Sequence, residues 1–212
     1  MTELNLGYSV WRNMTGQGES ESDRLCAQLP KLRGGFVIAI SIFVLEIVAG
    51  VQKGLANGTP QERSAGGYAL ALAVIADVMA TAYVLSSIST FHSIVNDVKG
   101  WSHPISPKRA VRFHFIPFFN IYWNFKWPVE MAKFVNWRTQ THRMSGVLVG
   151  ALVLAGFLVA GFVEVSVGLV IVLSAFAYIS RCLRAALAAA PVPADFQIAD
   201  DSNARYLETS AH

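Results

Sequence analysis

Residues 145–182 decide the fold, and they read SGVLVGALVLAGFLVAGFVEVSVGLVIVLSAFAYISRC. The run of about 38 residues is too long for one membrane-crossing helix of about 20 residues, but it is long enough for two of about 18. Val163 and Glu164 interrupt it near its middle. The run therefore predicts a helical hairpin made of residues 145–162 and 165–182.

Two further apolar stretches precede this hairpin. Residues 34–54 are interrupted only by Glu46 within their apolar centre, and residues 67–88 carry Asp77 near their middle. A polar turn around Asn57, Gly58 and Pro60 separates them, so they predict a first hairpin. The whole chain of 212 residues is 53% hydrophobic and only 15% charged, and its charges avoid these stretches. This segregation indicates a membrane protein and excludes a soluble enzyme domain.

The distribution of basic residues gives the orientation. Of the 17 Lys and Arg residues, two fall in the loop between the first two spans, and all others fall on the side that holds both termini. Because basic loops stay in the cytoplasm, both termini are expected there. The predicted fold is an all-α polytopic protein of the bacterial inner membrane, with four transmembrane helices in two hairpins. Its parts are a cytoplasmic segment 1–33 without a cleaved signal peptide, a membrane domain 34–190, and a disordered cytoplasmic tail 191–212.

Between the hairpins, residues 109–138 are rich in aromatic residues and punctuated by charge. On a helix, Lys126, Glu130 and Lys133 fall on one side, within an arc of about 60°. The opposite arc of about 120° holds apolar side chains, namely Trp123, Trp127, Met131, Phe134 and Val135. Since Trp and Tyr favour the headgroup region, we expect an amphipathic helix along the cytoplasmic interface. It is either an anchor that fixes the second hairpin or a surface that binds a partner protein or lipid headgroups.

Two prolines should shape this segment. Pro117 and Pro128 each remove a backbone donor, so the helix is expected to bend or restart at both, with Asn120 and Asn124 available as caps. The result should be a kinked, partly re-entrant element, with Tyr122 at the headgroup level.

The string Ile116-Pro117-Phe118-Phe119-Asn120-Ile121-Tyr122-Trp123, followed by Pro128 and Met131, resembles bacterial four-span membrane families of uncharacterised function. These families share an I-P-x-x-N signature between two apolar hairpins, and some relatives append the module to a GYF-like domain. The resemblance implies the four-span topology. It carries no catalytic residue onto this chain.

Glu46 and Asp77 are the acids expected inside the membrane. Counted from opposite ends of antiparallel helices, their depths differ by only about 3 Å, so they could meet near the midplane. Nearby small residues, including Ala39, Ala73 and Ala80, favour close helix contact. Two carboxyls at that depth cannot both ionise easily. They could join these two helices, bind a basic residue of another subunit, or carry a proton.

Other features favour no known chemistry. The spacings of His92, His103, His114 and His142 match no helical metal-ligand pair, and the two cysteines form no C-x-x-C motif, so no metal or cofactor is expected. The Gly50-x-x-x-Gly54 and Gly146-x-x-x-Gly150 pairs permit close helix approach. Nothing indicates nucleic-acid binding or an enzyme, although a hidden membrane enzyme would use the loop from His92 to His142.

The leading functional hypothesis is an accessory or scaffold subunit that packs against other membrane proteins or against a second copy of itself. The alternative is a small proton-coupled transporter or channel that uses Glu46 and Asp77.

Overall fold

The computed structural model describes residues 16–55 and 60–190, and every regular element in these ranges is a helix. In chain order the elements are α2 (Gly16–Gln28), α3 (Leu32–Leu55), α4 (Pro60–Asn96), α5 (Pro107–Arg112), the 3-10 helix η1 (Phe113–Phe115), α6 (Phe119–Thr139), α7 (Gly146–Phe162) and α8 (Val165–Ala188). The all-α prediction is confirmed for this part of the chain. The expected tail 191–212 and the first 15 residues lie outside it.

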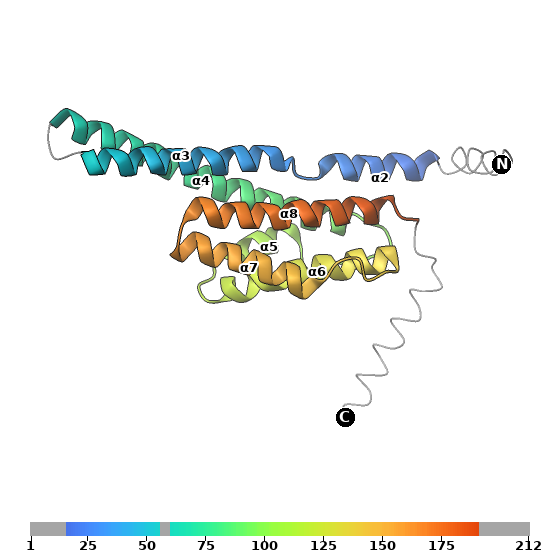
Figure 1. The fold of residues 1–212 in the computed structure, drawn as a ribbon. Helices are drawn as coiled ribbons and strands as arrows, with labels where there is room; N and C mark the ends of the chain where they lie inside the picture. Colours follow the sequence, from blue (N-terminus) through green and yellow to red (C-terminus); the bar gives the residue numbers. More distant parts are fainter. Residues whose placement is uncertain (1–15, 56–59, 191–212) are drawn as a thin grey trace, which may run out of the picture.

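Helices α3 and α4 form the first hairpin. The expected spans 34–54 and 67–88 fall inside them, but α4 has 37 residues and continues to Asn96. Its extension is explained by a stripe at helical spacing, Val84, Ile88, Phe91 and Val95, which is buried in the core. Figure 1 shows α3 and α4 side by side, reaching past the end of the bundle where α7 meets α8.

Helices α7 and α8 form the second hairpin, with α3 lying along α8 (Figure 1). Their boundaries follow from their caps. The Ser145 hydroxyl accepts from the Leu148 amide, and the Glu164 carboxylate accepts from the amides of Ser166 and Val167. The helices touch at backbone level, because a Cβ built on Gly168 would lie 2.2 Å from the Ala160 nitrogen.

Helix α6 packs antiparallel against α7 at the predicted glycine pair. A Cβ on Gly150 would lie 2.7 Å from the Phe125 carbonyl oxygen, and one on Gly146 would lie 3.3 Å from Val129. These glycines therefore let α7 lie directly on α6. Gly50, in contrast, faces open space.

The aromatic face of α6 forms the centre of the core. The Trp127 ring stacks on Phe91 with centroids 6.2 Å apart, and both rings meet the edge of Phe176 at 5.5 Å. The side chains expected at the membrane surface are instead buried among α4, α7 and α8, and they are Trp123, Trp127, Met131 and Phe134. This corrects their expected position. The apolar stripe was identified, but it faces other helices of the same chain.

The segment before α6 turns sharply. The chain leaves η1 at Phe115 and α6 begins at Phe119, as the expected restart at Pro117 requires. Phe118 turns the corner at φ 61° and ψ −41°, a region that side chains rarely adopt. At Pro128, where a bend or a restart was expected, the helix does not restart, because α6 runs through this residue.

Two segments, Ala71–Asn96 and Val165–Ala188, are long and apolar enough to cross a membrane. Gly146–Phe162 is apolar but shorter. Among the described residues this is evidence for membrane association, and it is weaker than the four-span topology would require.

Candidate functional site

Two groups of polar side chains lie within the apolar body of the molecule. The first, which we call the acid site, joins Glu46 of α3 to Glu164 at the start of α8. The two side chains share a hydrogen bond. Two carboxyl groups can do so only when one of them carries a proton.

The surroundings of Glu164 show which of the two is ionised. Its carboxylate accepts from the Ser166 amide at 3.0 Å, from the Val167 amide at 2.6 Å and from the Ser166 hydroxyl. Because these three donors point at the Glu164 carboxylate, Glu164 is the acceptor in the pair and Glu46 is the donor.

Asp77 of α4 is the third acid near this site. It lies within electrostatic range of Glu164, and one of its carboxyl oxygens is buried without a partner among the described residues. Glu46 and Asp77 also interact electrostatically, but the hydrogen bond of Glu46 goes to Glu164. The fold thus adds Glu164 to the pair expected from the sequence.

The second group, the histidine site, lies between α4, the loop that follows it, η1 and α6. The His92 Nδ1 and His103 Nε2 atoms are 2.7 Å apart and share a hydrogen bond. His92 is fully buried. Gly100, at φ 81°, supplies the left-handed residue with which the loop turns back toward α4.

Each ring of the His92–His103 pair has a second nitrogen that takes no part in this hydrogen bond. In a neutral pair one ring donates and the other accepts, so one N–H and one bare nitrogen remain at the outer edges. These atoms, His92 Nε2 and His103 Nδ1, are buried and have no partner among the described residues. A proton that enters at one outer nitrogen while another leaves at the opposite one would interchange the two tautomers. The pair can therefore pass a proton without holding a net charge.

His114 and Asn124 complete the histidine site. The Ala110 carbonyl accepts from His114 Nδ1 and from the Trp123 indole, each at 2.9 Å. This fixes the η1 ring against α6. The Asn124 amide donates to the Asn120 oxygen at 2.7 Å, so the two asparagines pair with each other and cap no helix. His114 and Asn124 also interact with each other through their side chains, and both are at least partly buried.

A charged cluster on α6 lies near the histidine site. Glu130 contacts Lys126 and Lys133, each at 3.0 Å. Burial raises the pKa of Glu130, but the two lysines outweigh it, so the net shift is downward. Burial lowers the pKa of His103 below its ordinary value of 6.5, and the Glu130 carboxylate opposes this shift only in part.

The structure separates the residues that the sequence grouped together. Of those expected at an interface, Pro117 and Tyr122 are exposed, Asn120 is half-buried, and the others lie in the core. The histidine site was not predicted, because its residues lie on different elements and helical spacing says nothing about contacts between them. The glycine between His92 and His103, which allows the loop to turn back, was the one feature of the sequence that indicated their contact. Glu164 was missed as well, because its place in the turn at residues 163–164 carries no sign of a contact with α3.

The described residues hold no group of three or more His, Cys, Asp or Glu side chains arranged to bind a metal ion. The three histidines near one another are thus a hydrogen-bonded and ring-stacked group.

Comparison with protein-family models, curated proteins and solved structures returned no match. The resemblance to four-span families with the I-P-x-x-N signature remains a prediction.

Proposed function

We propose that this chain is an integral protein of the bacterial inner (cytoplasmic) membrane, with both termini in the cytoplasm and two helical hairpins embedded in the lipid. Support comes from the surface of the hairpins. On α3 and α4 the side chains of Val37, Phe43, Ile75 and Val78, among others, are exposed although they are apolar. An apolar surface of this extent is typical of contact with lipid or with another protein. The positions of the basic residues support the orientation.

Within the membrane, the proposed role is that of an accessory or scaffold subunit. The observation that carries it is the position of Glu46 and Asp77. Both are half-buried in the first hairpin, and no basic side chain contributes to the electrostatics of either one among the described residues. Acidic groups at membrane depth usually pair with a basic or polar group. A helix of another membrane protein that carries Lys, Arg or His at this depth would provide such a partner, and so the first hairpin is the proposed contact surface.

The aromatic face of α6 contributes nothing to this surface, because the protein's own core covers it. Tyr122 and Ile121, at the exposed start of α6, are the aromatic and apolar residues of that helix that remain accessible.

Purification in a mild detergent tests this role. The wild-type protein should co-purify with a specific membrane partner, identified by mass spectrometry, and Asp77→Asn should weaken that association. Ser41→Ala is the matched control, because the exposed Ser41 hydroxyl donates to the Val37 carbonyl of its own helix at 2.9 Å. A stable, solitary monomer in the wild-type preparation would contradict the proposal.

Proton-coupled transport is the second candidate, and the hydrogen bond between Glu46 and Glu164 favours it. A shared proton between two carboxyls, with Asp77 nearby, is an arrangement that can take up and release protons. In proteoliposomes loaded with a pH-sensitive dye, Glu46→Gln and Asp77→Asn should each abolish proton flux while Ser41→Ala preserves it. If the wild-type protein carries no flux, this candidate is removed.

A further inference from the structure

One end of the helical bundle is apolar where loops would ordinarily be polar. Two turns meet there. The α7–α8 turn exposes Phe162 and Val163 at 86% and 76%, and the α5–α6 corner exposes Phe115 and Phe118 at 70% and 89%. Both lie toward the same end, since the His114 ring, next to Phe115, is 6.2 Å from the ring of Phe157 on α7. We call this surface the apolar tip.

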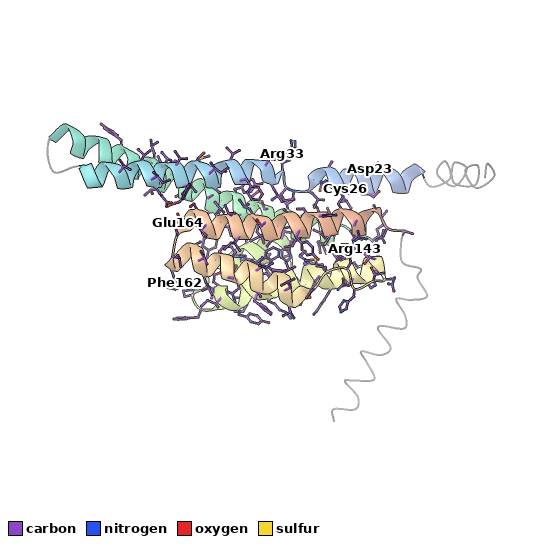
Figure 2. All side chains as sticks on the ribbon, in the orientation of Figure 1. Asp23, Cys26, Arg33, Arg143, Phe162 and Glu164 are labelled. Atoms are coloured by element: carbon purple, nitrogen blue, oxygen red, sulfur yellow. The ribbon has the colours of Figure 1, made fainter. Side chains whose placement is uncertain are left out.

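The opposite end of the bundle is basic. Arg143 precedes α7, and Arg181 and Arg184 lie near the end of α8, all three exposed. The Tyr178 hydroxyl donates to the Arg143 carbonyl at 3.3 Å, which holds the start of α7 beside the last turns of α8. Figure 2 shows Phe162 and Glu164 at one end of the bundle and Arg143 toward the other. Because Gly35 lies beside Leu173, Arg181 and Arg184 lie farther from the turn than Arg33 does, on the cytoplasmic side of it.

Several amides around the α7–α8 turn donate within the chain. The amides of Val163 and Glu164 both donate to the Val159 carbonyl at 2.9 Å. The Glu164 carboxylate accepts from the amides of Ser166 and Val167, and the Gly168 amide donates to the Glu164 carbonyl at 3.1 Å. Backbone polar groups in lipid need partners within the protein, and these bonds supply partners for the amides named here. The carboxylate itself is also satisfied, by Ser166 and Glu46.

The depth of this turn follows from its position along α3. Glu46 bonds to Glu164, and a Cβ on Gly35 would lie 2.8 Å from the Leu173 side chain, so α3 runs antiparallel alongside α8. From Arg33 to Glu46 is about 13 residues, or about 20 Å. A hydrocarbon layer is about 30 Å thick, so about 10 Å of it remains beyond the turn. Helix α3 fills this distance, because it continues past Glu46 for about nine residues, and Ile47, Val48 and Val51 expose apolar side chains there.

We propose that the apolar tip is inserted among the lipid acyl chains and stops short of the outer membrane surface, so that α7 and α8 form a re-entrant hairpin and only α3 and α4 cross completely. Beside this hairpin, the α5–α6 corner contributes the exposed rings of Phe115 and Phe118 to the tip, while the exposed Arg112 of α5 stays outside the acyl chains. The inference rests on the membrane location proposed above, and it replaces the expected outer position of the α7–α8 turn with one inside the lipid. The distribution of basic residues fits equally well, because residues 144–180 contain no Lys or Arg.

Labelling of single cysteines tests the inference in native membranes. In a background with Cys26→Ser and Cys182→Ala, the test variant is Val163→Cys. The controls are Gly58→Cys, in the polar loop between α3 and α4, and Thr141→Cys, which is exposed before α7. A membrane-impermeant maleimide should label position 58 from outside spheroplasts and position 141 from the cytoplasmic side of inverted vesicles. Position 163 should react from neither side, and should react fully after the membranes are dissolved in SDS.

Each outcome decides one of the two proposals. Labelling of position 163 from outside, together with position 58, would overturn the re-entrant hairpin and leave four complete crossings in place. Labelling of position 58 from the cytoplasmic side, or release of the protein by a carbonate wash, would overturn the membrane topology itself.

A nitroxide on the same Val163→Cys variant, reconstituted in phosphatidylethanolamine and phosphatidylglycerol vesicles, identifies what covers the tip. Its spin relaxation should be enhanced several-fold more by oxygen, which concentrates in acyl chains, than by a water-soluble nickel chelate. Stronger relaxation by the nickel chelate would mean exposure to water, and protection from both reagents would mean a protein cover. Either result would contradict insertion in lipid.

Discussion

His92 in α4 and His103 in the following loop are hydrogen-bonded through their rings, with 2.7 Å between Nδ1 and Nε2. The bond ties the end of the longest helix to the loop that leads into α5. The ring of His92 also stacks on Trp123 of α6, with centroids 6.0 Å apart. The histidine pair therefore connects α4, the loop that follows it and α6.

Removing one member of the pair should destabilise the fold more than removing both. His103→Leu leaves the buried Nδ1 of His92 without its partner, and an unsatisfied buried polar group costs about 1–3 kcal/mol. The double variant His92→Phe, His103→Leu removes both groups and should recover part of that loss. Thermal unfolding in a mild detergent, arranged as a double-mutant cycle, measures the coupling. Strictly additive losses would show that the hydrogen bond contributes nothing.

The stability of the wild-type protein should fall as the pH is lowered from about 6.5. Burial places the pKa of His103 below its ordinary value in the folded state, so the unfolded chain binds a proton that the folded chain does not. The contribution of neutral His103 is complete above pH 6.5 and decreases as the pH falls toward the folded-state pKa. Melting temperatures between pH 7.5 and pH 5 should show this slope, and His103→Leu should flatten it. His142→Ala is the control, since His142 is exposed. An equal slope in wild type and His103→Leu would refute the assignment.

The position of the α6 aromatic face can be tested with two substitutions on one helix. Trp127 is fully buried and Tyr122 is exposed, so Trp127→Ala should lower the free energy of unfolding by about 3–5 kcal/mol and Tyr122→Ala by less than about 1 kcal/mol. Both should retain membrane binding. If Trp127 instead served as a surface anchor, its loss would reduce membrane binding and leave the melting temperature unchanged.

The helices were predictable from this sequence, because an apolar stretch long enough to cross a membrane forms a helix regardless of the sequence around it. The second hairpin needed only the length of residues 145–182 and the interruption at Glu164. The burial of α6 was not predictable in the same way. A stripe of Trp123, Trp127 and Met131 fits a membrane interface and a protein core equally well, and the choice depends on whether other helices cover it. Gly146 and Gly150 decide this, because they allow α7 to lie on α6.

The two polar sites show the same limit. The depth count brought Glu46 and Asp77 together by comparing the two helices of the first hairpin alone. Because the second hairpin turns earlier, Glu164 reaches the level of Glu46 and takes its hydrogen bond. His92 and His103 meet through a turn at Gly100, and such loop-mediated contacts leave no periodic trace in the sequence.

Glu130 should stabilise the protein only while it is ionised. Lys126 and Lys133 hold its folded-state pKa below the ordinary value of 4.5, so its contribution is complete above that pH and is lost as the pH falls through the lowered pKa. Because both lysines reach solvent, we expect Glu130→Gln to cost only about 0.5–1 kcal/mol at pH 7 and progressively less as the pH falls below 4.5. Thermal unfolding over this pH range checks this. A loss that does not decrease with pH would indicate a packing role instead of a charge effect.

The contact between α7 and α8 depends on Gly168. Gly161 lies in the same hairpin and provides a control substitution. A Cβ on Gly168 would lie 2.2 Å from the backbone nitrogen of Ala160 and 2.5 Å from its Cα, and a helix backbone cannot move aside as a flexible side chain can. Gly168→Ala should therefore force the helices apart and lower the free energy of unfolding by about 3 kcal/mol, the upper end for overpacking. At Gly161 an added Cβ meets nothing within 4 Å, so Gly161→Ala should be neutral or should stabilise by up to about 1 kcal/mol through helix propensity. Equal melting temperatures for the two variants would show that α7 and α8 are not in backbone contact at Gly168.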